Sequence, residues 1–281
     1  MPSETATSAG LVALATGMLS EAGRGEPRRE ALRLWRDLLG GHPALAPAAA
    51  VDDGAATRFL DAARRRAAGE PLAHVTGRAG FRHLDLRCDR RALIPRPETE
   101  GLVDLLLARA RYGQVADIGT GTGALALSLA QEGGYRRVIA VDISAAALDL
   151  ARENRRLTGA DIDLVRGDLC TALGTASLDA LVANPPYLSD GEYASLDGSV
   201  RDWEPALALA SGPDGMAATA RLLDEGRRPL RPGGWLALEV DCNRAGDAAR
   251  RAGELGWTEI AIHADLFGRE RYLLARRSAT S

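Results

Sequence analysis

From about residue 101 onward, short apolar runs of strand length alternate with amphipathic runs of helix length. Strands and helices that alternate along a chain form a mostly parallel sheet with helices on both faces, so this pattern predicts an α/β fold. The pattern predicts strands at 114–118, 137–142, 162–165, 179–183, 235–240, 258–263 and 270–276, and helices at 123–132, 145–157, 215–229 and 244–255.

The last two predicted strands differ from the others in how they are connected. Only the short segment 264–269 separates them, whereas parallel neighbours need a crossover of about a dozen residues or more. We therefore expect an antiparallel hairpin at one edge of an otherwise parallel, seven-stranded sheet of the doubly wound, Rossmann-like type.

The N-terminal part of the chain carries apolar side chains at helical spacing. A first helix is expected from Ser8 to Leu19, a second over the run that ends at Gly40-Gly41, and a third from about Asp53 to Ala68. The first run lacks a flanking arginine, so we interpret it as an amphipathic helix and not as a signal peptide. We expect no membrane-spanning segment, because no apolar run has the necessary length.

The pattern changes between residues 73 and 93, where apolar and polar side chains alternate. His74–Gly77 and Phe81–Cys88 are therefore predicted to be short strands, arranged as a hairpin. The changes of pattern divide the chain into a small helical domain over 1–75, a hairpin and linker over 76–98, and a sheet domain over 99–281.

A glycine-rich loop follows the first predicted strand of the sheet. It consists of Gly119, Thr120, Gly121, Thr122 and Gly123. Glycine allows positive φ and lets a ligand lie against the backbone, and the helix N-terminus beyond the loop supplies N–H groups without intrahelical partners. The loop alone also fits a dinucleotide-binding pattern, because Gly119, Gly121 and Ala124 satisfy its spacing.

Acidic residues lie in or directly after the first three strands. Asp117, inside the first strand, would help to hold a cationic amino-acid group. Asp142 ends the second strand, where its carboxylate would accept hydrogen bonds from both hydroxyls of a cofactor ribose. Asp168 and Leu169 follow the third strand and are expected beside an adenine, the alternative role for Asp168 being a helix cap.

The tetrapeptide 184–187 closes the fourth strand. It reads Asn184, Pro185, Pro186 and Tyr187. Two consecutive prolines cannot donate to a sheet ladder, so the strand ends there, and the residue before the first proline is held extended.

This corner offers an amide oxygen, a backbone carbonyl and an aromatic face at the edge of the sheet where ligands bind. These groups suit a planar amino group, either a carboxamide or the exocyclic amine of a base. With Asp117, the corner favours S-adenosylmethionine over a nucleotide as the cofactor.

The sequence resembles the bacterial release-factor glutamine methyltransferases, the HemK/PrmC family, over nearly its whole length. The shared elements are the glycine loop, the corner at 184–187, Gly69–Leu72, Thr76-Gly77, Leu93–Glu100, Val141–Ser144 with Ala147-Leu148, Val200–Pro205, Pro232–Gly234 and Asp265–Arg271. One segment departs from the family pattern: Asp241–Arg244 stands where the family usually has a glycine and then a glutamine.

The resemblance implies a class I S-adenosylmethionine-dependent methyltransferase whose N-terminal helical domain helps to dock a protein substrate. The implied reaction transfers a methyl group to the side-chain amide nitrogen, N5, of the glutamine in the Gly-Gly-Gln motif of class I peptide chain release factors, which act in translation termination. Asn184 and Pro185 match the family's Asn and first Pro, so the resemblance implies that they are the catalytic pair that binds the amide. Asn184 is also expected to border the cofactor. Pro186 and Tyr187 complete the substrate slot.

Three further expectations concern the surroundings of this site. Arg96 and Glu98 are expected to line it, an ion pair near the start of a helix being the alternative. The segment 188–203 is expected to be a substrate-side lid. No general base is assigned, because an alkylated amide loses its extra proton readily.

Composition limits the possible partners and chemistry. The net charge is −3 and no basic stripe stands out, so we expect no stable nucleic-acid partner. All 35 basic residues are arginine, which excludes a lysine nucleophile. The cysteines and histidines show no zinc-site spacing, so we expect no metal site, and a cytoplasmic location fits. We expect a monomer.

Other functions stay open at this point. The same corner could serve a glutamine methyltransferase for a ribosomal protein, or an adenine-N6 methyltransferase for nucleic acid, although the latter would carry a basic groove and a target-recognition domain. A catalytically silent S-adenosylmethionine-binding module is the third alternative, and the intact Asn184 and Pro185 argue against it.

Overall fold

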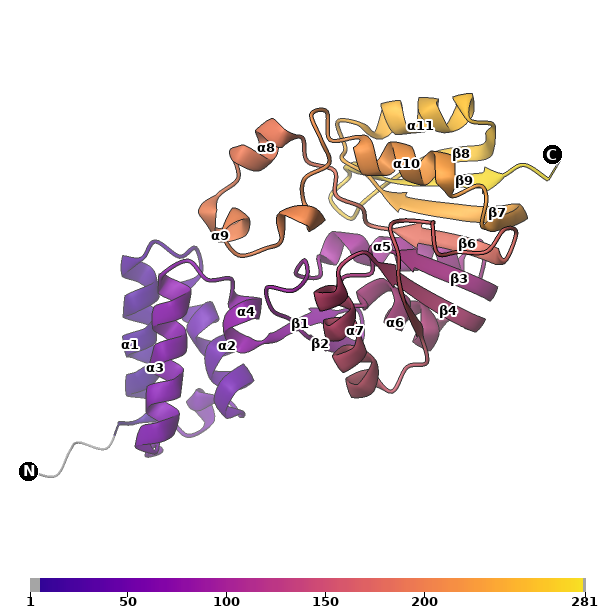
Figure 1. Cartoon of the computed structure of the whole chain (residues 1–281). Helices are drawn as coiled ribbons and strands as arrows, with labels where there is room; N and C mark the ends of the chain where they lie inside the picture. Colours follow the sequence, from indigo (N-terminus) through magenta and orange to yellow (C-terminus); the bar gives the residue numbers. More distant parts are fainter. Residues whose placement is uncertain (1–5, 280–281) are drawn as a thin grey trace, which may run out of the picture. The chain divides into compact units, whose positions relative to one another are not determined.

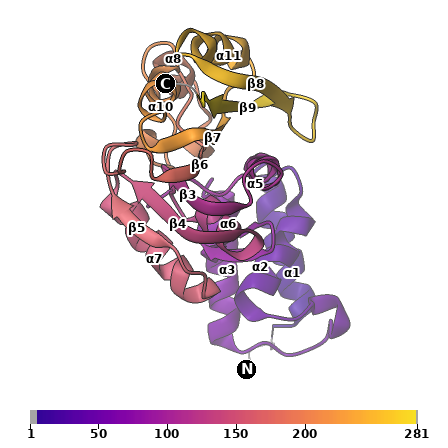
Figure 2. The same cartoon turned by 90° about the vertical axis from the view of Figure 1, so that its right-hand side faces the viewer.

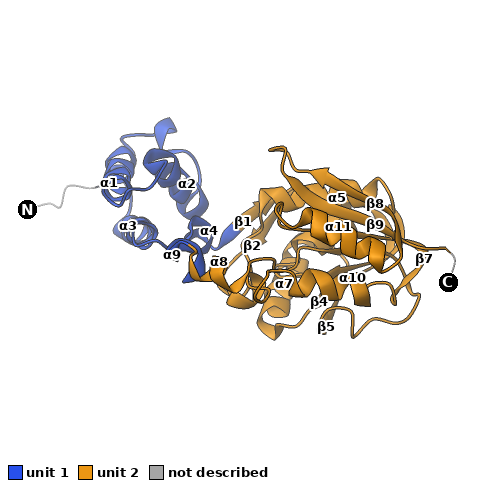
Figure 3. Cartoon of the chain, turned by 90° about the horizontal axis from the view of Figure 1, so that it is seen from above, with its two compact units in different colours: residues 1–78, 197–203 blue, residues 79–196, 204–281 orange. Residues whose placement is uncertain are grey.

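The computed structural model describes residues 6–279, which fall into two compact units. Unit 1 comprises the chain up to Arg78 together with Asp197–Trp203, and unit 2 comprises Ala79–Leu196 and the chain from Glu204 onward (Figure 3). Each unit has its own hydrophobic core. None of the helices in the described part of the chain is long and apolar enough to cross a lipid bilayer.

Unit 1 is helical, which confirms the three helices expected from the apolar spacing (Figure 1). Its core centres on Trp35 and Phe59, whose rings meet edge to face with centroids 5.2 Å apart. The side chain of Asp52 accepts a hydrogen bond from the Ala55 N–H and so caps the third helix. The helical elements are α1 (Ser8–Glu21), α2 (Pro27–Leu39), η1 (Pro43–Leu45), α3 (Asp53–Ala67), α4 (Leu72–Thr76) and α9 (Gly198–Arg201).

The strand predicted at His74–Gly77 is wrong. The segment forms the short helix α4, which follows Pro71 and ends at Gly77, where φ is 70°. A proline before the first helical turn and a glycine after the last are ordinary helix boundaries, and four alternating residues do not distinguish one helical turn from a strand. The hairpin lies slightly further along the chain, between β1 (Arg78–Phe81) and β2 (Leu84–Arg87). The predicted strand Phe81–Cys88 therefore contains the hairpin turn, and only its part from Leu84 onward is the second strand.

Unit 2 contains a seven-stranded sheet with the order β5-β4-β3-β6-β7-β9-β8 (Figure 2). Strand β9 is antiparallel to both of its neighbours, and the other pairs are parallel. The predicted fold class and the closing antiparallel hairpin are therefore confirmed. The strands are β3 (Tyr112–Ile118), β4 (Gly134–Asp142), β5 (Asp163–Arg166), β6 (Leu178–Ala183), β7 (Leu230–Glu239), β8 (Trp257–Ala264) and β9 (Glu270–Arg277).

Helices cover both faces of this sheet, because its central strands are apolar on both sides. In β6, Leu181 belongs to the core cluster that also contains Leu222 of α10, whereas Val182 belongs to the opposite cluster, which contains Leu127 of α6. The helical elements of unit 2 are η2 (Pro97–Thr99), α5 (Glu100–Leu107), α6 (Ala124–Glu132), α7 (Ala145–Thr158), α8 (Asp190–Ala194), η3 (Ala206–Ala208), α10 (Ala217–Glu225) and α11 (Ala245–Glu254).

The order of the strands creates a switch point between β3 and β6. From β3 the chain first adds β4 and β5 on one side, and it then returns to add β6 on the other. Crossovers on opposite sides of a sheet leave a crevice at the carboxyl ends of the two adjacent strands, which is where α/β folds bind ligands. The glycine loop and the 184–187 corner both begin at this place.

Candidate active site

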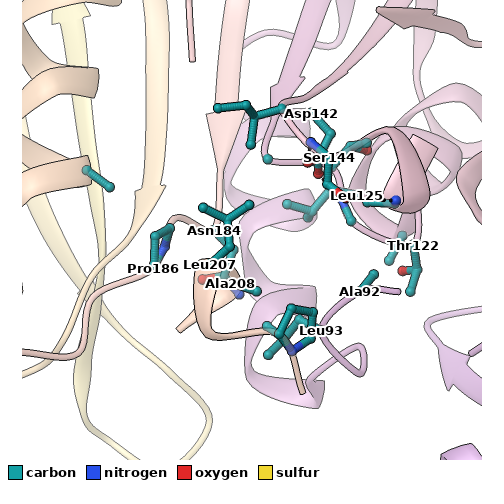
Figure 4. A pocket seen from close by; sticks show the side chains of 18 of the residues that line it. Ala92, Leu93, Thr122, Leu125, Asp142, Ser144, Asn184, Pro186, Leu207 and Ala208 are labelled. Carbon is teal, nitrogen blue, oxygen red and sulfur yellow. Dashed lines mark hydrogen bonds between the residues drawn. The ribbon is translucent and has the colours of Figure 1, made fainter. Parts of the chain in front are cut away.

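A cavity of about 390 Å³ lies at the carboxyl ends of β3, β4 and β6. Figure 4 shows Asn184 and Pro186 on one side of it and Thr122 on the other. Of the thirteen sequence-predicted site residues, nine line this cavity: Gly119, Thr120, Gly121, Thr122, Asp142, Asp168, Leu169, Asn184 and Pro186. The remaining four, Asp117, Gly123, Pro185 and Tyr187, lie outside the lining.

The glycine loop has the left-handed conformations that its sequence predicts. Gly119, Gly121 and Gly123 have φ values of 72°, 56° and 87°. The N–H groups of Gly119 and Thr120 both donate to the Val141 carbonyl, at 2.8 and 3.0 Å, so the loop is tied to strand β4. A Cβ placed on Gly119 would meet no protein atom within 4 Å. The space beside this glycine therefore belongs to the cavity.

Asp142 joins the loop to the start of α7. One carboxylate oxygen accepts the Gly121 N–H at 2.9 Å, and the other accepts the Ser144 N–H at 2.9 Å. Burial raises the pKa of Asp142, while these backbone donors act in the opposite direction. Its position at the end of β4, in the cavity wall, is the one expected for a partner of ribose hydroxyls.

Asp117 lies behind the loop. Its side chain is buried, and one carboxylate oxygen accepts the Thr120 hydroxyl at 2.6 Å and the Ala126 N–H at 3.2 Å. The other oxygen has no hydrogen-bond partner in the structure. Burial raises the pKa of Asp117 to about 7, against the lowering effect of these two donors. Asp117 therefore holds the loop and the first turn of α6 together from below.

Asp168 and Leu169 form the part of the wall that follows β5. The Asp168 carboxylate forms an ion pair with Arg221 of α10, with two N–O distances of 3.1 Å. The alternative role of Asp168 as a helix cap is wrong, since the next helix, α8, begins only at Asp190. Leu169 has a φ of 47°, which is unusual for a residue with a branched side chain. Strained backbone of this kind is concentrated at binding sites.

The corner after β6 carries a chain of hydrogen bonds. The Asn184 Nδ2 group donates to the Thr99 Oγ1 at 2.9 Å, and the Thr99 hydroxyl donates to Glu239 Oε2 at 2.7 Å. The Tyr187 hydroxyl lies 3.3 Å from the other Glu239 oxygen. Tyr187 therefore lies behind the corner, where its hydroxyl contacts Glu239, and it does not line the cavity.

Glu239 is the buried end of this chain, at 1% exposure. Burial raises its pKa, and the Thr99 hydroxyl, the Arg271 guanidinium and the Tyr187 hydroxyl lower it. Arg271 lies 3.7 Å from Glu239 Oε1, which provides partial compensation for the buried charge. Burial also raises the pKa of Tyr187, so that its phenol keeps its proton.

Thr99 and Glu239 are site residues that were not predicted from the sequence. Glu239 ends the buried strand β7, in which the preceding residue, Leu238, pairs with Ala183 of β6. A polar residue at the carboxyl end of a buried strand is the same signal that singled out Asp142 and Asn184. That signal was present at Glu239 also, whereas the only indication for Thr99 was its place in the Leu93–Glu100 element shared with the family.

The segment 91–96, which precedes α5 and is called the strap below, forms a further part of the wall. Arg96 lines the cavity, and its guanidinium lies 2.5 Å from Glu204 Oε1. The second Glu204 oxygen accepts the Ile94 N–H at 2.9 Å. Arg96 therefore lines the cavity as expected, and its ion-pair partner is the distant Glu204 and not Glu98. Glu98 lies outside the lining, and its backbone carbonyl accepts the Tyr272 hydroxyl.

The segment 241–244, which departs from the family pattern, contacts the residues that follow the 184–187 corner. Arg244 donates to Glu192 of α8 at 2.7 Å and to the Tyr187 carbonyl at 3.3 Å. Ser189 and Glu192 form a capping box at the start of α8, and the Ser189 N–H and hydroxyl, followed by Arg244, lower the pKa of Glu192 to about 2. The first part of the 188–203 segment is therefore a capped helix and not an irregular loop.

Comparison with known proteins identifies the family. Over 274 residues, the chain is 40% identical to the release factor glutamine methyltransferase of Deinococcus radiodurans, and the alignment covers 95% of this chain and 98% of that protein. The chain belongs to the release factor glutamine methyltransferase family. The resemblance found in the sequence motifs is thereby confirmed.

Further comparisons agree with membership of this family. The family models for the PrmC N-terminal domain and the methyltransferase small domain match residues 11–77 and 97–197. The release factor glutamine methyltransferase of Streptomyces coelicolor is 38% identical over 278 residues, which is 95% of this chain and 97% of that protein. The crystal structure of a methyltransferase from Pyrococcus furiosus has the same fold, with a TM-score of 0.54, 20% identity, and coverage of 81% of this chain and 100% of that chain.

Proposed function

We propose that this protein transfers a methyl group from S-adenosylmethionine to the side-chain amide nitrogen of the glutamine in the Gly-Gly-Gln motif of class I peptide release factors. The observation that carries the proposal is the presence of the Asn184 side chain and the glycine loop in the wall of a single cavity. Membership of the family supports the choice of reaction, because relatives of nearly the same length bear the name of that activity.

The residues of the cavity fit S-adenosylmethionine. Its volume, about 390 Å³, is within the usual range of small-molecule sites, and the open space beside Gly119 admits a ligand against the backbone. Asp142 would bind the ribose hydroxyls, and Asp168 and Leu169 would border the adenine. Asp117 would act from behind, by keeping the loop in shape. When bound, S-adenosylmethionine supplies a methyl group made electrophilic by a positively charged sulfur.

The protein's own contribution to this reaction is to hold the substrate amide. A carboxamide nitrogen is a poor nucleophile, so the rate depends on its placement, which can supply roughly 7–11 kcal/mol in favourable cases. Asn184 Oδ1 and the Pro185 carbonyl each accept one N–H of the amide. Positive charge grows on the nitrogen during transfer, so these fixed acceptors bind it more strongly in the transition state than in the ground state.

The remaining parts of the chain contribute to substrate binding. The helical unit 1 docks the release factor, and the segment 188–203 acts as a substrate-side lid over the bound glutamine. The protein acts as a monomer in the cytoplasm, and its target is a protein and not a nucleic acid. The net charge of −3 supports this choice of partner.

A transfer assay with radiolabelled S-adenosylmethionine tests the proposed reaction. The purified protein is offered a class I release factor, and in parallel the same factor with its Gly-Gly-Gln motif changed to Gly-Gly-Ala. Label on the first and none on the second is the expected result. If neither factor is labelled while S-adenosylmethionine still binds, the proposal fails, and a ribosomal protein becomes the next substrate to examine.

A further inference from the structure

The direction of the hydrogen bonds behind Asn184 follows from the chemistry of the groups involved. Glu239, as a carboxylate, can only accept, so the Thr99 hydroxyl must give it its single proton, over 2.7 Å. The remaining capacity of Thr99 Oγ1 is that of an acceptor. Asn184 lies 2.9 Å away and must therefore present its NH2 group to Thr99.

This arrangement fixes which way the Asn184 amide points. A side-chain amide has its acceptor on one side and its donors on the other, and the two orientations differ by a half-turn. With Nδ2 held by Thr99, Oδ1 faces away from Thr99. A flipped amide would place two acceptors, Oδ1 and the Thr99 oxygen, against each other, and the NH2 group would repel the N–H of a substrate amide.

Burial makes the arrangement durable. Thr99 is 5% exposed and Glu239 is 1% exposed, so water does not replace these partners readily. Glu239 also faces the Tyr187 hydroxyl at 3.3 Å and the Arg271 guanidinium at 3.7 Å, both of which favour its ionised, accepting form. The buried carboxylate of Glu239 thus determines which group donates and which accepts at Thr99 and then at Asn184, whose side chain lies in the cavity wall.

We infer that Thr99 and Glu239 are positioning residues, which orient the Asn184 amide so that Oδ1, and not Nδ2, meets the N–H of the substrate glutamine. The inference rests on the proposed function, since it assigns Asn184 Oδ1 the acceptor role in that reaction. Thr99 lies in the cavity wall and Glu239 behind it, and both would act on the substrate amide through Asn184.

Two variants of Thr99 separate orientation from packing. Thr99→Val keeps the shape of the side chain and removes the hydroxyl, whereas Thr99→Ser keeps the hydroxyl and removes a methyl group. In the transfer assay we expect Thr99→Val to lower kcat about tenfold or more, with the Kd for S-adenosylmethionine close to that of the wild type. Its thermal unfolding midpoint should be somewhat lower, because Glu239 and Asn184 each lose a hydrogen-bond partner. We expect Thr99→Ser to retain most of kcat.

A spectroscopic measurement reports the amide directly. The side-chain NH2 resonance of Asn184 is assigned in a ¹⁵N–¹H correlation spectrum by its loss in Asn184→Ala. Thr99→Val is expected to move this resonance toward the position of a free amide, and Thr99→Ser is expected to leave it near its wild-type position.

The outcomes distinguish this inference from the proposed function. If the wild type labels the release factor but Thr99→Val has the same kcat, or Thr99→Ser is as slow as Thr99→Val, the inference is overturned and the function stands. If the wild type labels no release factor, the proposed function fails. The NMR comparison then still decides whether Thr99 orients Asn184, and an unmoved resonance in Thr99→Val overturns that orientation as well.

Discussion

Ile118 and Ala183 are direct partners in the parallel pairing of β3 with β6. Because the two strands run in the same direction, the residues that follow them start at the same edge of the sheet. Gly119 and Asn184, which are distant in the sequence, therefore enter one cavity. This single register relationship brings the glycine loop and the 184–187 corner together, and under the proposed function it explains why a methyl donor and an amide would meet here.

Asn184→Ala is expected to separate binding from turnover. It removes one acceptor of the substrate amide, and the loss of one such preorganised group costs about 3–4 kcal/mol, or roughly 10²–10³ in kcat. The Kd for S-adenosylmethionine, measured by calorimetry, should change little. Asn243→Ala is the matched control, since Asn243 is exposed and follows β7 outside the cavity lining. Equal losses of binding and turnover in Asn184→Ala would contradict the assigned role.

Gly119→Ala is expected to weaken cofactor binding more than tenfold, because its methyl group would occupy the space reserved for the ligand. Gly159→Ala provides the control for backbone strain. Gly159 has a φ of 68°, close to the 72° of Gly119, and its Cβ would also meet nothing within 4 Å. Both variants should lose about 1–2 kcal/mol of stability, but only Gly119→Ala should lose affinity. Similar affinities for the two variants would show that the cavity beside Gly119 is not the cofactor site.

Asp117→Asn is expected to change how stability depends on pH. Burial raises the pKa of Asp117 to about 7 in the folded protein, from an ordinary value of 3.8 in the unfolded chain. The folded state therefore binds more protons between these values, and the contribution of Asp117 to stability is complete below about pH 4 and is lost as the pH rises toward 7.

The variant isolates this contribution because an asparagine oxygen can still accept from the Thr120 hydroxyl and the Ala126 N–H. Urea unfolding from pH 4 to pH 8 should show the wild type losing stability relative to Asp117→Asn, at up to about 1.4 kcal/mol per pH unit. Parallel stability curves for the two proteins would mean that the Asp117 carboxylate is not protonated in this range.

Glu204→Ala is expected to destabilise the strap that carries Arg96. It removes a buried carboxylate that accepts the Ile94 N–H and pairs with a partly exposed guanidinium, which should cost about 2–3 kcal/mol. Glu254→Ala breaks an exposed ion pair with Arg250 and should cost less than about 1 kcal/mol. Urea unfolding of both variants checks the difference, and a small effect of Glu204→Ala would show that the strap is held by other contacts.

The rate of methyl transfer is expected to fall at acidic pH as Glu239 takes up a proton. Its pKa is raised by burial, and Glu98 adds to this effect, whereas Thr99, Arg271 and Tyr187 oppose it. A protonated Glu239 can donate to Thr99, whose hydroxyl is then free to donate to Asn184 Oδ1, and the amide loses its productive orientation. The pH profile of kcat should show an acidic decline that is weaker in Thr99→Val, and identical declines would contradict this explanation.

Much of the site could be predicted because its parts are encoded locally. Positive φ at Gly119 and Gly121 follows from the lack of a Cβ, and the end of β6 follows from Pro185 and Pro186. These are properties of a few consecutive residues, so they can be deduced without knowledge of the partners. The local errors between residues 74 and 88 are a strand where α4 forms and one strand where β1 ends and β2 begins, and they arose because these segments are too short to show a period.

Long-range partners could not be deduced in this way. Thr99 and Glu239 are 140 positions apart, and Asp168 and Arg221 are 53 apart, so nothing in either neighbourhood indicates the other. Their meeting depends on which strands pair and in which register. The same holds for Asp117, whose carboxylate was expected near the cofactor and instead lies under the loop, since the alternation of side chains across a packed sheet determines the face to which it turns.

The sequence by itself therefore determined the fold class, the ends of the central strands, the glycine loop and the corner at 184–187, because each depends on backbone chemistry within a short stretch. Only the tertiary structure decided how the Asn184 amide is oriented and which carboxylates face the cavity. Hydrogen bonds between distant side chains form only after the sheet has brought their strands together, and their direction depends on the donors and acceptors that meet there.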